Sequence, residues 1–122
     1  MIQTANDIFV LHTAHTTYAF RKLPTGQLEH LYYGRKTDGV MDYLLTYADR
    51  GFSGNPQDAG NDRTYSLDVL PQEFPCRLTG DFRSPVLDLV NADGSFGCDL
   101  RYQGYEICDG KYNLKGLPAV YA

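Results

Sequence analysis

The sequence predicts an all-β fold, an antiparallel β-sandwich with at most a short helix. Short runs of β-branched and aromatic residues alternate with turn signals along most of the chain, as is typical of sandwiches. Sustained helical periodicity is missing from nearly all of it. The 122 residues suffice for one hydrophobic core and are too few for two. We therefore expect residues 1–122 to form a single β-sandwich domain.

The first strands are expected near the amino end. The apolar run Ile8–His12 and the run Thr16–Phe20, which is rich in β-branched and aromatic residues, both favour extended structure. A turn is expected at Pro24–Gln27, because proline presets its own φ and Gly26 can adopt a positive φ. Leu28–Tyr33 would then be the returning strand of a hairpin.

The middle of the chain departs from this pattern. Val40, Tyr43, Leu44 and Tyr47 are spaced as on one face of a helix, so one or two helical turns are expected there. The stretch Asp49–Arg63 contains three glycines, a proline and many Asp and Asn residues, which predicts a long loop. Loops of this length in compact domains are usually functional or mobile.

Further strands are expected in the second half. Tyr65–Leu70 alternates polar and apolar residues and ends at a proline. Val86–Val90 and Phe96–Tyr102 flank Asn91–Ser95, whose Asp-Gly pair is a strong hairpin signal. The last segment, Leu117–Ala122, is apolar and lacks polar closure, so we expect the chain to be a fragment of a longer protein.

Charge and cysteine usage exclude several classes of function. The net charge of −4 and the scattered lysines and arginines argue against nucleic acid and membrane surfaces as partners. The first residues lack the basic and apolar regions of a secretory signal. The cysteines have no Cys-x-x-Cys spacing and are expected to be reduced thiols in a cytoplasmic protein, with no metal site and no cofactor; they are Cys76, Cys98 and Cys108.

The segment Gly80–Pro85 carries the most information. Asp81 and Arg83 can hold an irregular crossing of the chain or clamp a sugar hydroxyl, and we favour the structural role. One acid alone cannot run glycoside hydrolysis, which commonly uses two carboxylates flanking one bond. Acidic residues are plentiful elsewhere, but the chain contains no Gly-x-Ser-x-Gly, Walker or His-Glu-x-x-His motif, so no catalytic residue is expected in it. The structural motif consists of Gly80, Asp81, Phe82, Arg83 and Pro85.

Ten tyrosines and six phenylalanines raise the question of a sugar-binding platform. Aromatic faces can stack on the apolar side of pyranose rings, but packing is the commoner fate of tyrosine in a β-sandwich. We assign Tyr32, Tyr33 and Tyr102 to packing. Tyr43 and Tyr47 stay open between packing and sugar contact.

Several short motifs follow one another in a characteristic order along nearly the whole chain. They are Phe9-Val10-Leu11, Thr17-Tyr18, Leu31-Tyr32-Tyr33-Gly34-Arg35-Lys36, Arg50-Gly51-Phe52-Ser53, Glu73-Phe74-Pro75, Gly80-Asp81-Phe82-Arg83-Ser84-Pro85, Leu100-Arg101-Tyr102 and Gly116-Leu117-Pro118-Ala119. In this order and spacing the chain resembles the amino-terminal domain of family-36 glycoside hydrolases, which are α-galactosidases. Thr79 and Tyr105 depart from the family pattern, which indicates a divergent member.

The resemblance implies a supersandwich domain that precedes a catalytic (β/α)8 barrel. In that family the barrel carries two aspartates for retaining cleavage of terminal α-galactosyl residues, as in melibiose and raffinose. Many members are homo-tetramers in which this domain supports assembly and lies beside a neighbouring subunit's active site. Our candidates for a substrate contact there are Asp49, Arg50 and Phe52. The alternative is a free-standing carbohydrate-binding or structural β-sandwich without an enzymatic partner.

Overall fold

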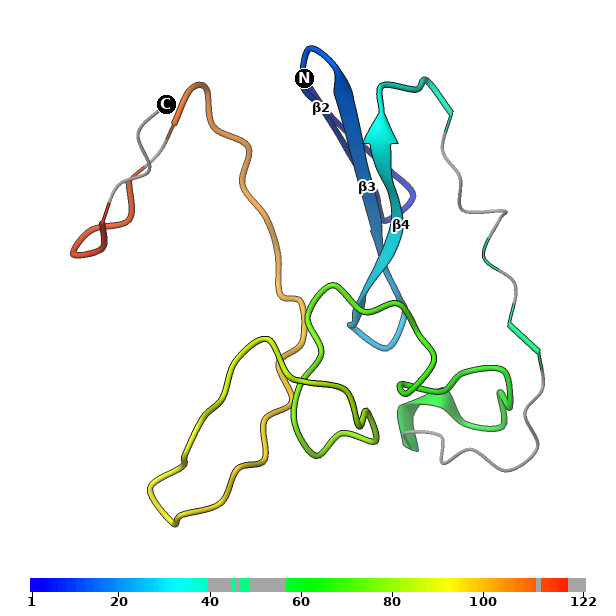
Figure 1. The fold of residues 1–122 in the computed structure, drawn as a ribbon, viewed down its shortest axis with the longest axis vertical. Helices are drawn as coiled ribbons and strands as arrows, with labels where there is room; N and C mark the ends of the chain where they lie inside the picture. Colours follow the sequence, from blue (N-terminus) through cyan, green and yellow to red (C-terminus); the bar gives the residue numbers. More distant parts are fainter. Residues whose placement is uncertain (40–44, 46, 49–56, 112, 119–122) are drawn as a thin grey trace.

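A computed structural model describes residues 1–39, 45, 47–48, 57–111 and 113–118 (Figure 1). Its amino-terminal part is an antiparallel sheet of four strands in the order β1-β2-β3-β4. The strands are β1 Ile2–Ala5, β2 Ile8–His12, β3 Thr16–Lys22 and β4 Leu28–Arg35, and a short 3-10 helix, η2, spans Gln57–Ala59. The predicted all-β antiparallel fold class is confirmed.

Three strands lie where the sequence predicts them. β2 has the predicted bounds, whereas β3 and β4 each continue past the predicted end, to Lys22 and Arg35. The predicted turn joins β3 to β4: the amide of Leu23 donates to the carbonyl of Gln27 at 2.9 Å, and Gly26 has a φ of 90°. A side chain at that φ would be strained, which explains the glycine.

Strand β1 was not predicted from the sequence. It pairs with β2 through a tight turn in which Asn6 and Asp7 have φ values of 50° and 63°. Asn and Asp tolerate this left-handed region better than other side chains do. A turn with two consecutive residues of positive φ has the backbone twist that suits the two strands of a hairpin. The Asn-Asp pair before an apolar run was therefore the signal that could have revealed β1.

The core of the sheet lies on one of its faces. Val10, Ala19 and Leu31 are buried there, and Ile8 and Tyr32 pack against them. The pairing of β3 with β4 shifts between Ala19 and Phe20, so that Leu31 becomes an extra residue opposite β3. Such a bulge locally bends and twists the strand that carries the extra residue. It lets adjacent residues of β4, Leu31 and Tyr32, both contribute to the core.

The strand predicted at Tyr65–Leu70 is wrong, because this segment folds into tight turns. The amides of Val69 and Leu70 both donate to the carbonyl of Ser66, at 3.2 and 3.0 Å. Leu67 and Leu70 are each only 2% exposed. Apolar residues spaced three apart meet on one side of a turn, and this spacing outweighs the apparent alternation.

The hairpin predicted for Val86–Val90 and Phe96–Tyr102 is also wrong, although its turn exists. The amide of Asn91 donates to the carbonyl of Ser95 at 2.9 Å. The flanking segments bond elsewhere: Val86 donates to Pro75 at 3.1 Å and Cys98 to Arg77 at 3.2 Å. Both segments therefore bond to the chain at Pro75 and Arg77 and not to each other. The described residues form one sheet, without the second layer of a sandwich.

Two further findings bear on the predicted organisation. The helix predicted at Val40–Tyr47 lies mostly outside the described residues. In the described part of the chain, no helix has the length and apolar character needed to cross a bilayer.

The chain after the sheet returns to the free edge of β4. The amide of His30 donates to Pro71 at 2.7 Å, and the amide of Glu73 donates to Leu28 at 2.9 Å. A bridge between Glu29 and Gln72 completes this short pairing. Figure 1 shows this returning segment, in green, crossing at the lower end of β4. The contact places the second half of the chain beside the turn that joins β3 and β4.

Candidate functional site

The residues nominated from the sequence for substrate contact, Asp49, Arg50 and Phe52, lie outside the described residues. The chain on either side of them is described. Tyr47 precedes them and Asp58 follows, and both line one pocket of ≈ 310 Å³ beside the sheet. The described residues on either side of the three candidates therefore line a single pocket.

Glu29 of β4 forms the charged floor of this pocket. It is 0% exposed, and its two carboxylate oxygens accept hydrogen bonds from Arg21 Nε and from the hydroxyl of Tyr47. A buried carboxylate is tolerated when it is paired and hydrogen-bonded in this way. Burial and the bond to Glu29 raise the pKa of Tyr47, so its hydroxyl stays protonated and donates. Glu29 therefore ties the start of the loop to the sheet.

Arg101 holds Asp58, on the carboxyl-terminal side of the three candidate residues. Its Nη1 lies 2.9 Å from Asp58 Oδ2, and its Nε lies 2.6 Å from Asp99 Oδ1. It also donates to the carbonyl of Thr25 in the β3–β4 turn. Tyr65 is joined to the same turn, since its hydroxyl is 2.6 Å from Thr25 Oγ1, and burial raises its pKa. Both ends of the loop are therefore fixed to the sheet by charged or hydroxyl contacts.

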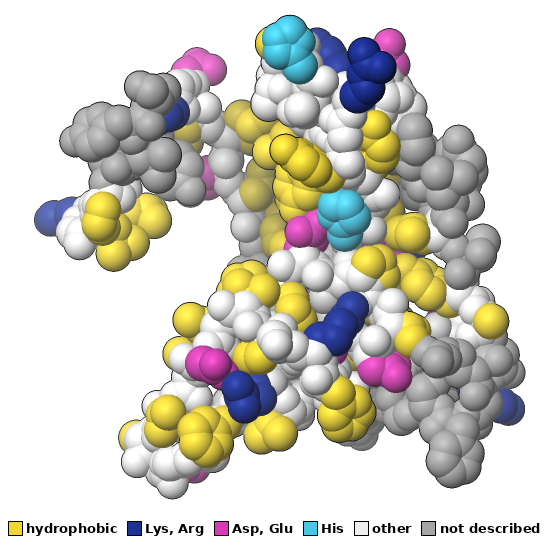
Figure 2. All heavy atoms as spheres, viewed as in Figure 1, with side chains coloured by type: hydrophobic (Ala, Val, Ile, Leu, Met, Phe, Trp, Pro, Cys, Tyr) yellow, Lys and Arg dark blue, Asp and Glu magenta, His cyan; other side chains and the backbone are white. Residues whose placement is uncertain are grey.

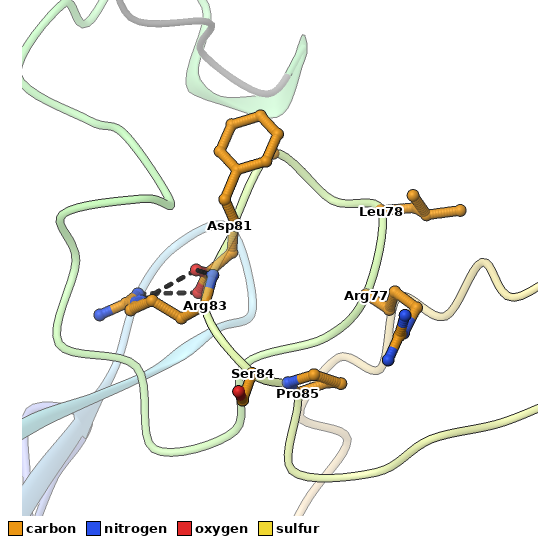
Figure 3. Close-up of a pocket in the computed structure, with 8 residues that line it drawn as sticks. Arg77, Leu78, Asp81, Arg83, Ser84 and Pro85 are labelled. Atoms are coloured by element: carbon orange, nitrogen blue, oxygen red, sulfur yellow. Dashed lines mark hydrogen bonds and ion pairs between the residues drawn. The ribbon is translucent and has the colours of Figure 1, made fainter.

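The Gly80–Pro85 motif forms a second site (Figure 3). Arg83 donates to Asp81 through Nε, at 2.8 Å to Oδ1, and through Nη2, at 2.8 Å to Oδ2. The same Nη2 donates to the carbonyls of Leu67 and Leu70, at 2.8 and 2.6 Å. Gln72 Nε2 also donates a hydrogen bond to Asp81 Oδ2, at 2.8 Å. This geometry places Asp81 and Arg83 in a bidentate pair that holds the 67–70 turn.

The electrostatics of this pair keep both groups charged. Burial acts to raise the pKa of Asp81, but the hydrogen bonds and the positive charge of Arg83 outweigh it and lower that pKa overall. The bond to Asp81 raises the pKa of Arg83. A carboxylate held ionised and fully hydrogen-bonded is a poor proton donor or nucleophile. Asp81 is thus built to stabilise a crossing of the chain.

Phe82 points into solvent, unlike the neighbouring Asp81. Its side chain is 93% exposed, whereas Asp81 is buried. It borders a shallow pocket of ≈ 510 Å³ that Arg77, Leu78 and Pro85 also line. Figure 3 shows Arg77 and Leu78 on the far side of the turn from Asp81 and Arg83. An aromatic ring so exposed is available to pack against another surface.

A row of rings covers the face of the sheet opposite the core. Tyr18 lies 5.4 Å from Phe20 and 6.3 Å from Tyr33 between ring centres. His30 Nδ1 lies 2.6 Å from Glu73 Oε1, and burial together with Glu73 raises the pKa of Tyr18. Figure 2 shows hydrophobic side chains gathered between two histidines in the upper part of the molecule.

The tyrosines assigned to packing have different fates. Tyr32 packs against the core and Tyr102 lies 5.9 Å from Phe9 between ring centres. Tyr33 is 69% exposed, and its packing is limited to the edge-on contact with Tyr18, 6.3 Å between ring centres. The extra residue Leu31 shifts the alternation along β4, so that Tyr33 lies opposite Tyr18, on the face away from the core.

The described part of the chain holds neither a metal-binding cluster nor a disulfide. Among the residues with described positions, no group of three or more His, Cys, Asp or Glu could hold a metal ion. All three cysteines are free thiols: Cys76 is buried, Cys98 is half-buried and Cys108 is exposed.

Sequence reasoning missed Glu29, the charge that fixes the loop. The signal was available, because Glu29 lies in a predicted strand two residues before the core residue Leu31. Alternation along a strand places such residues on the same, inward face. A charged residue at an inward position needs a partner, and Arg21 supplies it from the paired strand.

These features define an all-β domain in which the buried carboxylates among the described residues, Glu29 and Asp81, are bound to arginines. Comparison with known proteins identifies its family. The chain belongs to the glycosyl hydrolase family 36 N-terminal domains, whose family model matches residues 26–122.

Individual relatives agree with this assignment. The chain is 62% identical to the bifunctional α-galactosidase/sucrose kinase of Mediterraneibacter gnavus over 115 residues, which are 94% of this chain and 12% of that protein. The solved galactosidase domain of an α-galactosidase-sucrose kinase matches with a TM-score of 0.89 and 58% identity, covering 100% of this chain and 17% of that one. A variant α-galactosidase from Geobacillus stearothermophilus, solved with raffinose, matches with a TM-score of 0.80 and 38% identity over 94% of this chain and 16% of that one. The chain therefore spans less than a fifth of the length of these relatives.

Proposed function

We propose that this chain works as the non-catalytic amino-terminal domain of an α-galactosidase. The enzyme would hydrolyse terminal α-galactosyl residues of oligosaccharides such as melibiose and raffinose, in the cytoplasm, with a (β/α)8 barrel as its catalytic part. The observation that carries the proposal is 62% identity to an α-galactosidase/sucrose kinase over 94% of this chain. Related enzymes solved with raffinose and with stachyose support the class of substrate.

The chemistry of the buried acids supports a non-catalytic role for the domain. Hydrolysis with retention needs two carboxylates about 5 Å apart, one of them free to give and take a proton. Glu29 and Asp81 are each bound to an arginine instead. The hydrolytic groups would then belong to the part of the enzyme outside this chain.

The domain would also support a homo-oligomer, a tetramer, and contribute to a neighbouring subunit's substrate pocket. Asp49, Arg50 and Phe52 are the residues proposed for that contact. Two observations support the choice: Tyr47 is bound to Glu29 before them, and Asp58 is bound to Arg101 after them. Contacts that fix the flanking residues lower the conformational entropy that a segment between them loses on binding. An arginine fork suits sugar hydroxyls, and a phenylalanine ring suits the apolar face of a sugar.

The test is the substitution Arg50→Ala in the full-length enzyme. Loss of a charged hydrogen bond to substrate costs about 1.5–3 kcal/mol, so kcat/KM should fall about 10- to 100-fold. The melting temperature should stay nearly unchanged, because the contact is made to substrate and not within the fold. Steady-state kinetics with raffinose and thermal unfolding measure the two quantities.

Arg35→Ala is the matched control. Arg35 is an exposed arginine at the end of β4, and its replacement by alanine removes the same charge as Arg50→Ala does. It should leave kcat/KM unchanged. Normal kinetics of Arg50→Ala together with a melting temperature lowered by several degrees would assign Arg50 to the fold and remove the loop from the active site.

A further inference from the structure

The segment that carries Cys76 is hydrogen-bonded on both sides. Pro75 accepts from the amide of Val86 at 3.1 Å, and Arg77 accepts from the amide of Cys98 at 3.2 Å. The sulfur of Cys76 itself accepts from the amide of Leu100 at 3.5 Å. The side chain of Cys76 therefore points at the segment that contains Cys98.

The spacing of these segments suits a covalent link. Cys98 donates its amide to the residue after Cys76, and the Cys76 sulfur accepts from the amide of the second residue after Cys98. A disulfide needs Cα atoms about 4.4–6.8 Å apart. The thiol of Cys98 is also hydrogen-bonded to the thiol of Cys76, so the two sulfurs face each other.

The two thiols already influence each other. Burial raises the pKa of the Cys98 thiol, and its interaction with the Cys76 thiol raises that pKa further. Cys98 is half-buried and Cys76 is buried, so an oxidant in solution reaches Cys98 first.

We propose that Cys76 and Cys98 are a disulfide-forming pair that a peroxide closes. The sulfur of Cys98 attacks one oxygen of hydrogen peroxide and becomes a sulfenic acid, and the other oxygen leaves as water with the thiol proton. The sulfur of Cys76 then attacks the sulfenyl sulfur, forms the S–S bond and displaces the hydroxyl group, which leaves as water with the Cys76 proton. Two thiols lose two electrons and two protons, and one peroxide becomes two waters.

The bond would close a covalent loop from residue 76 to residue 98. This loop contains the Asp81–Arg83 pair and the turn at Asn91–Ser95. Thiol reductants would open it again. The inference concerns the fold of this chain and stands whether or not the proposed enzymatic role is correct.

Peptide mapping tests the proposal directly, because trypsin places each cysteine in a separate peptide. Cleavage after arginine and lysine gives residues 64–77 with Cys76, 84–101 with Cys98 and 102–111 with Cys108. The folded protein is reduced, freed of reductant, treated with hydrogen peroxide, alkylated and digested. The expected product is the linked pair 64–77/84–101, in at least about tenfold excess over any link to 102–111, because Cys76 and Cys98 lie on segments that are hydrogen-bonded to each other.

Cysteine variants separate the roles of the three thiols. Cys108→Ser should form the 64–77/84–101 link as fast as the parent protein. Cys76→Ser should form no such link and should leave Cys98 as a sulfenic acid that dimedone captures, with circular dichroism showing that the variant is folded. Three alkylated thiols after peroxide treatment, or links made mainly to Cys108, would overturn the proposal in the parent protein even if Cys76→Ser fails to fold.

Discussion

At the scale of single residues, Arg83 shows how one side chain can stabilise a turn that has no partner strand. Its guanidinium serves the carbonyls of Leu67 and Leu70 and both oxygens of Asp81. Carbonyls left without donors beside a buried turn would cost about 1–3 kcal/mol each. The sequence predicted that Asp81 and Arg83 hold an irregular crossing of the chain. In the structure the segment to which Arg83 donates is the 67–70 turn.

Asp81→Asn should therefore lower the free energy of unfolding by about 1.5–3 kcal/mol, because it removes a charge-assisted bond from a buried position. The pKa of Asp81 is lowered in the folded state, so its contribution is fully present above the unfolded pKa of about 3.9. It is lost as the pH falls through the lower, folded pKa. Urea unfolding of both proteins at several pH values should show the difference shrink toward acid.

Asp88→Asn is the control for this effect. Asp88 pairs with Arg77, but its side chain is 71% exposed, and such surface pairs contribute about 0–1 kcal/mol. An equal loss of stability in both variants, or a loss in Asp81→Asn that does not change with pH, would contradict the assigned role of Asp81.

At the scale of elements, β3 contributes side chains to both faces of the sheet, the core on one and the row of rings on the other. One of its faces carries Ala19, which is 1% exposed between Val10 and Tyr32 on the flanking strands. The other face carries Phe20, which stacks on Phe9 with ring centres 4.9 Å apart. A small residue on the core side allows Leu31 of the bulge to reach the same space.

Ala19→Leu should destabilise the fold by about 1–3 kcal/mol, because the close-packed core has no room for three more carbon atoms. The denaturation midpoint in urea should fall while its slope stays constant. Ala5→Leu makes the same change at an exposed position of β1 and should stay within about 0.5 kcal/mol of the parent. Equal stability of Ala19→Leu and Ala5→Leu would mean that Ala19 does not border a packed core.

At the scale of the whole molecule, the second half of the chain leaves many large apolar side chains in water. Among the described residues after Glu73, those at least 39% exposed are Phe74, Leu78, Phe82, Val86, Leu87, Val90, Phe96, Leu100, Tyr105, Ile107, Leu114 and Leu117. Monomeric proteins rarely expose apolar surface on this scale. This agrees with the proposal that the domain packs against further parts of an α-galactosidase.

The purified chain alone should not hydrolyse an aryl α-galactoside. Its described buried carboxylates, Glu29 and Asp81, are bound to arginines, whereas the reaction needs two paired carboxylates, one of them free to exchange a proton. Release of the aryl alcohol, followed by absorbance, measures the reaction, with the full-length enzyme as the positive control. Turnover that persists after host enzymes are removed would refute the non-catalytic role, and Asp- and Glu-to-Ala substitutions would then locate its source.

The local part of this fold could be predicted from the sequence. β2, β3, β4 and the turn at Pro24–Gln27 follow from side-chain periodicity and from the φ preferences of proline and glycine, which act within a few residues. The pairing of Asp81 with Arg83 is equally local, since the two are separated by one residue.

Tertiary structure decided which partner each extended segment found. Residues 86–90 and 96–102 have strand-like sequences, yet they bond to the chain around Pro75 and Arg77 and not to each other. Glu29 became the centre of a pocket because distant residues, Tyr47 and Arg21, meet it there. A backbone amide bonds equally well to any carbonyl, so the choice among partners depends on which arrangement buries the apolar side chains and satisfies the charges of the whole chain.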